Sequence, residues 1–116
     1  MTKPFPKSLN GAISHLAILS ILKQKDNYGY EIGKIILETS KGKINWKPGV
    51  LYPLLKKMES QNLIKSKWII EDNERARKYY TIQKKGLKKI EELREEWQLA
   101  SSILNDLNEK SQAKIK

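Results

Sequence analysis

The sequence predicts a mainly helical α+β fold that ends in one long helix, and three observations support this fold class. Apolar residues recur at helical spacing in three segments before residue 62. Two β-rich segments then flank an acidic turn, which is typical of a hairpin. From residue 84 onwards, apolar residues return every three or four positions, as in a helix that packs lengthwise against a partner.

The three helical segments come first along the chain. Residues 8–25 are apolar on more than one face, so we expect this helix to be buried on several sides. The turn at residues 28–30 leads into a second helix to about residue 40, and Gly42 suits the left-handed position after its end. A third helix begins near Pro48, because proline is tolerated in a first turn, and continues to about residue 61. Its apolar residues share one face, which is expected to point inward.

The two β-rich segments form the predicted hairpin. Residues 63–70 alternate between apolar and polar side chains, and residues 71–74 form the acidic turn. Residues 77–83 form the returning strand, because tyrosine, threonine and isoleucine favour extended backbone. We expect Trp46, before the third helix, and Trp68, in the first strand, to be packing residues. Three helices followed by a hairpin is the plan of a winged helix-turn-helix.

The last helix is expected from residue 84 to about residue 109, with a frayed basic tail over residues 110–116. Little of the chain remains to cover its apolar seam, so we expect it to pack against a second copy; the alternative is that it folds back on the first helix. The expected units are a winged helix-turn-helix domain, residues 1–83, and a dimerisation helix with its tail, residues 84–116. The seam, and thus the expected dimer interface, consists of Leu87, Ile90, Leu93, Trp97, Ala100, Leu104 and Leu107.

The net charge of +10 is concentrated in one part of the chain. Residues 41–80 hold eight lysines and two arginines against four acidic residues, so the predicted third helix and hairpin carry +6. A basic patch attracts polyanions and speeds encounter with them. On charge alone, a solvated basic surface is an equally good interpretation.

The residues that would support an enzyme are scarce. The chain has no cysteine and one histidine, which excludes disulfides, thiolate metal sites and a thiol–histidine pair. It has no phosphate-binding glycine loop, so we predict no catalytic site, no metal and no cofactor. The longest apolar stretch, residues 12–22, is too short to span a membrane, and we expect a cytoplasmic protein.

A helix of this kind beside a basic hairpin suits double-stranded DNA. The third helix would enter the major groove, where Tyr52, Lys56 and Lys57 could reach phosphates or base edges. Cations of the hairpin would contact the backbone, which positions a protein without reading sequence. Of the adjacent Tyr79 and Tyr80, one is expected to pack inward and the other to face DNA. The predicted DNA-binding residues are Lys47, Val50, Tyr52, Lys56, Lys57, Lys67, Arg75, Arg77, Lys78 and Tyr80.

Three short motifs carry a resemblance to a known family. Residues 28–32 (YGYEI), 48–55 (PGVLYPLL) and 77–80 (RKYY) resemble, in order and spacing, motifs of the PadR family of bacterial transcriptional regulators. The resemblance covers about residues 9–108 and is to the short subfamily with a single C-terminal helix. It implies a homodimeric DNA-binding repressor whose first and last helices form the dimer interface. Val50 departs from the family, in which many members have threonine at this position.

The chain is also similar to a multidrug-responsive repressor of that family, in which paired tryptophans at the dimer centre hold planar aromatic compounds. The resemblance implies that Trp97 has this role, although ordinary dimer packing explains its position equally well. His15 is more often a buried or capping polar group than a sensor in such a place. The residues expected to line a ligand cavity are Leu9, Ala12, His15, Leu16, Ile90, Leu93 and Trp97.

The sequence therefore predicts a homodimeric, sequence-specific repressor that binds double-stranded operator DNA and is relieved by a planar aromatic or phenolic effector. The main alternative is a winged-helix module that binds a protein or RNA without responding to a ligand. A small enzyme is the second alternative, and it would require clustered titratable groups in one cavity.

Overall fold

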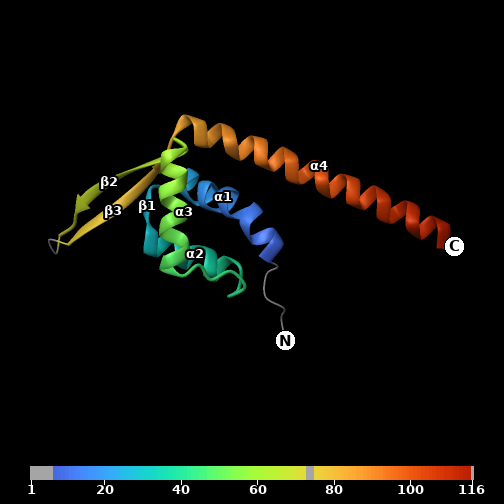
Figure 1. Cartoon of the computed structure of the whole chain (residues 1–116), viewed down its shortest axis with the longest axis horizontal. Coiled ribbons are helices and arrows are strands. Elements are labelled where there is room, and N and C mark those ends of the chain that lie inside the picture. The colour runs from blue at the N-terminus through green and yellow to red at the C-terminus, as the bar shows by residue number, and fades with distance from the viewer. Residues whose placement is uncertain (1–6, 73–74, 116) are drawn as a thin grey trace.

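The computed structural model describes the backbone of residues 7–72 and 75–115, and the side chains of residue 9 and of residues 11–72 and 75–110. A three-stranded antiparallel sheet lies beside three helices, and a fourth, long helix leaves the compact part (Figure 1). The elements in chain order are α1 (Lys7–Gln24), β1 (Asn27–Tyr28), α2 (Gly29–Thr39), α3 (Pro48–Ser60), β2 (Ile64–Ile70), β3 (Ala76–Ile82) and α4 (Lys84–Ile115).

The predicted mainly helical fold with a hairpin and a long last helix is confirmed, with two differences. Residues 27–28 form a short strand that pairs with β3, giving the strand order β1-β3-β2. Two residues are too few for an alternating pattern, so the sequence carries no signal for this strand. The tail expected to fray from residue 110 continues as helix to Ile115. Neither glycine nor proline occurs after Gly86, so no residue there interrupts a helix.

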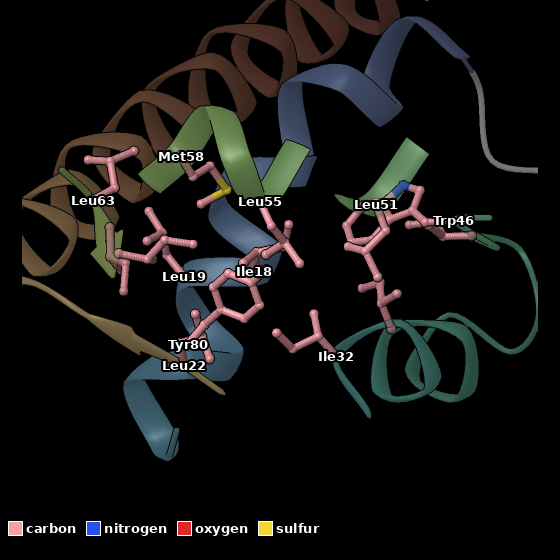
Figure 2. Close-up of a cluster of buried hydrophobic side chains, with 14 residues drawn as sticks. Ile18, Leu19, Leu22, Ile32, Trp46, Leu51, Leu55, Met58, Leu63 and Tyr80 are labelled. Carbon is pink, nitrogen blue, oxygen red and sulfur yellow. The ribbon is translucent and has the colours of Figure 1, made fainter. Parts of the chain in front are cut away.

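The hydrophobic core surrounds the second half of α1. Ile18 and Leu19 have no exposed surface, and side chains from α2, α3, the sheet and the start of α4 complete the cluster. Figure 2 shows Tyr80 among the labelled core side chains, together with residues of α1, α2 and α3. The helix that was expected to be buried on several sides thus lies at the centre of the molecule.

The segment between α2 and α3 fixes the start of α3. Gly42 has a φ of 82° and follows the end of α2, which confirms the predicted left-handed glycine. The Ser40 hydroxyl accepts a hydrogen bond of 2.9 Å from the Ile44 amide. Ile44 and Trp46 are buried, so Trp46 is a packing residue as predicted, and the chain enters α3 from an anchored position.

Helix α4 begins in contact with α1, with Gly86 close to Ile82 of β3, and then projects away from the compact part (Figure 1). Its 32 residues make it about 48 Å long, in a molecule with a longest extent of 67 Å. Ile90 is 1% exposed and belongs to the core, whereas every described side chain from residue 98 to residue 110 is exposed. Among residues 7–72 and 75–115, no helix combines the length and the apolar character needed to cross a membrane.

Candidate nucleic-acid interface

Helix α3 has one buried and one exposed face. Leu51, Leu55 and Met58 are buried, which confirms the inward face predicted from their spacing. Val50 is 56% exposed and Tyr52 is 45% exposed. Lys47, Lys56 and Lys57 are exposed as well. The outer face therefore presents one aromatic hydroxyl and several ammonium groups to the solvent.

The ring of Tyr52 packs directly on the first residue of α2. A Cβ atom added to Gly29 would lie 2.5 Å from Cε1 of Tyr52, which is closer than real Cβ atoms approach. Only glycine leaves room for the ring at this position, so Gly29 sets where the Tyr52 side chain lies. Residues 28–30 were predicted to be a turn and residues 28–32 a family motif, but neither pattern predicts this packing role of Gly29.

The hairpin is joined to α3 along one face of β2. The hydroxyl of Ser66 donates a hydrogen bond of 2.6 Å to a carboxylate oxygen of Glu59 in α3. Ser66 is paired with Tyr80 across the strands, and Trp68 is paired with Lys78, so these four residues share this face. Tyr80 on this face is buried in the core, and the hairpin starts beside α3 and extends away from the helices (Figure 1).

The burial of Tyr80 corrects one predicted DNA contact. Tyr80 is 4% exposed and lies in the core, because its pairing with Ser66 places it on the covered part of the sheet face. Burial, and after it the negative charge of Glu59, raises the pKa of the Tyr80 hydroxyl above its ordinary value. Tyr80 is thus a neutral core residue and is not available to a duplex.

The exposure of Trp68 corrects a second prediction. Trp68 was expected to pack, yet it is 67% exposed, and Ile70 on the same face is 74% exposed. The hairpin is longer than the core is wide: Ile64 is buried, and Trp68 lies four residues, about 13 Å, further along the strand. The outer half of the hairpin therefore carries a large aromatic side chain in solvent.

The opposite face of the hairpin holds an interconnected polar cluster. Arg77 forms an ion pair of 3.5 Å with Glu71, and its guanidinium lies 4.5 Å from the ring centroid of Tyr28. The Tyr79 hydroxyl donates a hydrogen bond of 2.8 Å to Glu71, and this bond raises the pKa of Tyr79 above its ordinary value. Arg77 was predicted to contact the DNA backbone, and in this structure its charge is already engaged by Glu71.

A groove of about 620 Å³ separates α3 from the hairpin. It brings together Tyr52, Lys56, Arg77 and Lys78 from the predicted set, with Tyr80 at its base. Lys47, Val50, Lys57, Lys67 and Arg75 lie outside its lining. The full lining is Tyr28, Gly29, Tyr52, Lys56, Glu59, Trp68, Ala76, Arg77, Lys78 and Tyr80.

Among the α4 residues predicted for the dimer interface and the ligand cavity, one is buried in the core and the others are partly buried or exposed. Ile90 is removed from both sets, because it is buried against α1 of its own chain. Near its start, α4 thus follows the alternative in which it folds back on the first helix. Leu93 and Trp97 are partly buried, and Ala100 is exposed. Leu87, Leu104 and Leu107 are 41%, 66% and 57% exposed.

The predicted cavity residues of α1 lie at or near the surface. Leu9 and Ala12 are exposed, and His15 and Leu16 are partly buried. The Nε2 atom of His15 lies 3.3 Å from the side-chain oxygen of Gln61, within hydrogen-bond distance. This contact with the end of α3 agrees with His15 being a bonded polar group, and its role towards a ligand stays a prediction.

Two exposed apolar residues of α4 are not part of the predicted dimer interface. Leu99 is 63% exposed and Ile103 is 49% exposed, and both lie beside the predicted seam at a spacing of four from each other and from Leu107. This spacing of four fits a helix face, but a single heptad-like seam does not include it. With these residues, the exposed apolar face of the outer half of α4 is wider than predicted.

Three helices, a hairpin joined to α3 along one face, and a long terminal helix define a winged helix-turn-helix protein. The profile of the PadR-like transcriptional regulator family matches residues 18–92, and the chain belongs to this family. The members of this family are transcriptional regulators, which confirms the prediction that the chain is not an enzyme. The similarity to a multidrug-responsive member stays a prediction.

Individual relatives agree with the family assignment. The chain is 36% identical over 81 residues to the transcriptional regulator YqjI of Escherichia coli. These matched residues make up 70% of this chain but only 37% of that protein. A solved transcriptional regulator from Clostridium thermocellum is 31% identical, with a TM-score of 0.78, covering 86% of this chain and 97% of that one. A PadR-like regulator from Bacillus cereus is 30% identical, with a TM-score of 0.75, covering 87% and 96% of the two chains.

Proposed function

We propose that the protein is a homodimeric repressor that binds double-stranded operator DNA through the outer face of α3 and the adjacent hairpin. One observation carries the proposal: Tyr52 and Lys56 of α3 share a groove with Lys78 of β3, in a chain that belongs to a family of transcriptional regulators. A helix of this exposure and charge fits the major groove, with the hairpin against the neighbouring backbone. Phosphate contacts by several cations would make binding weaken steeply with added salt.

Dimerisation is part of the proposal because a two-fold molecule presents two copies of α3 to one duplex. The exposed apolar face of α4 supports it, since a face of this size on a projecting helix is typical of a protein interface. The two α3 helices would meet successive major grooves, which lie about 34 Å apart. The monomer would reach only one half-site.

We expect the double substitution Tyr52→Ala and Lys56→Ala to weaken binding about a hundredfold, because each base or phosphate contact contributes roughly 1–3 kcal/mol. The measurement is a gel-shift series with the duplex upstream of the protein's own gene. Lys88→Ala, at an exposed position on α4, is the control for a lost positive charge. Unchanged affinity in the double variant would contradict the proposal that α3 contacts the operator. Without any salt-sensitive, sequence-dependent shift for the wild type, the alternative of a protein- or RNA-binding module would be preferred.

We further propose that a planar aromatic effector binds between the two copies of Trp97 and favours a spacing of the α3 helices that no longer matches the operator. Partial exposure of Trp97 in the single chain supports this proposal, because a second copy could approach its ring. We expect planar aromatic compounds to quench tryptophan fluorescence in the wild type and not in Trp97→Ala. Quenching that persists in the variant would assign the signal to Trp46 or Trp68.

A further inference from the structure

The outer half of the hairpin exposes an aromatic side chain that no role above explains. Trp68 is 67% exposed and Ile70 is 74% exposed, and their alternation in β2 places them on the same face. A lone exposed apolar residue is ordinary, but a tryptophan beside an isoleucine forms a patch that calls for a partner. Ser66 lies on the same face and donates a hydrogen bond to Glu59 of α3. The patch formed by Trp68 and Ile70 therefore lies on the side of the hairpin that faces α3.

The charges around Trp68 indicate the kind of partner. Lys78 is its cross-strand neighbour, and Lys56 of α3 lines the same groove. One carboxylate, Glu59, also lines this groove and accepts a hydrogen bond from Ser66, so the two lysines outnumber it there. A groove with two lysines and an aromatic ring complements a chain of phosphates that alternate with flat or apolar groups, as in one strand of a nucleic acid.

We propose that Trp68 is a direct DNA contact, and that one strand of the duplex passes through the groove between α3 and the hairpin. The indole packs against a sugar or base edge of that strand, while Lys56 and Lys78 contact its phosphates. This inference rests on the proposed function and adds an aromatic contact to a site otherwise built from cations and Tyr52. It also gives a role to the exposed indole at the position where the hairpin leaves the core.

The first test compares affinity and its salt dependence in two hairpin variants. We expect Trp68→Ala to weaken binding to the upstream duplex about tenfold, because burial of a large apolar side chain favours binding and the indole is only partly covered by a sugar or base edge. The slope of log affinity against log salt should stay at its wild-type value, because no phosphate contact is lost. Lys78→Ala should reduce the magnitude of that slope by about one contact. Wild-type affinity in Trp68→Ala would overturn the inference.

The second test reports on Trp68 directly. We expect Trp68→Phe to keep most of the affinity lost in Trp68→Ala, because a ring remains on the same face. The change in tryptophan fluorescence on saturation with duplex should be present in the wild type and absent from Trp68→Phe. An identical change in both proteins would place Trp68 outside the contact. In either case, wild-type binding to the duplex keeps the proposed function intact, whereas a wild type that binds no duplex overturns both proposals.

Discussion

Replacement of Gly86 by alanine is expected to lower the free energy of unfolding by about 2 kcal/mol, because the first turn of α4 crosses directly over the backbone. A Cβ atom at this position would lie 2.3 Å from the carbonyl oxygen of Leu63 and 2.8 Å from Cγ1 of Ile82. The Leu63 carbonyl cannot easily give way, because it accepts a hydrogen bond of 2.9 Å from the Gln83 amide. Chemical denaturation measures the change, and in a thermal scan we expect a midpoint lower by roughly 10 °C.

Gly11→Ala is the matched control for this substitution. Gly11 lies within α1, and a Cβ atom there would meet nothing within 4 Å. Alanine has the higher helix propensity, so this variant should be more stable than the wild type by roughly 0.5–1 kcal/mol. The same gain in Gly86→Ala would mean that α4 does not enter the fold over Leu63 as described.

The double substitution Leu104→Glu and Leu107→Glu is expected to weaken the dimer by about a hundredfold or more. These side chains are 66% and 57% exposed in the single chain, and a charge on each would have to be desolvated in an apolar interface. Sedimentation should show a shift towards the 13.5 kDa of one chain at concentrations where the wild type is twice that mass. Operator affinity should fall with it, since each monomer presents one copy of α3.

The fold of the monomer should survive these changes, because neither leucine belongs to the core. Circular dichroism and the thermal midpoint of the winged domain test this point. Ser102→Glu, on the opposite side of α4, introduces one such negative charge on the polar face and is expected to leave the dimer intact. Wild-type association in the double leucine variant would reject the outer half of α4 as the interface. A wild type that is monomeric yet binds its operator tightly would reject the homodimer altogether.

The orientation of α3 could be predicted from the sequence alone. Its apolar residues recur at a spacing that fits one face of a helix, and Leu51, Leu55 and Met58 are buried as that spacing requires. Once the inward face is fixed, Tyr52 and Lys56 must lie towards solvent. The solvent-facing side of α3 thus follows from helical geometry, whereas the contacts of α3 with DNA stay a prediction.

The hairpin shows where such reasoning ends. Alternation in a strand divides residues between two faces, but it does not say how far along the strand the core extends. Tyr80 and Trp68 lie on the same face of the sheet, yet Tyr80 is buried and Trp68 is exposed. Only the packing of α1 and α3 against the sheet decides which part of that face is covered, and the predictions for both residues were wrong for this reason.

The same distinction applies to α4 and to the protein as a whole. The sequence by itself determined the order of the four helices and the two hairpin strands, the solvent-facing side of α3 and the apolar seam of the long last helix, because these follow from local spacing along the chain. The tertiary structure decided that Ile90 is covered by α1 of the same chain and that Gly29 positions Tyr52. It also decided that the outer half of the hairpin extends beyond the core. Each of these depends on contacts between segments far apart in sequence, and local periodicity carries no information about which segment supplies the contact.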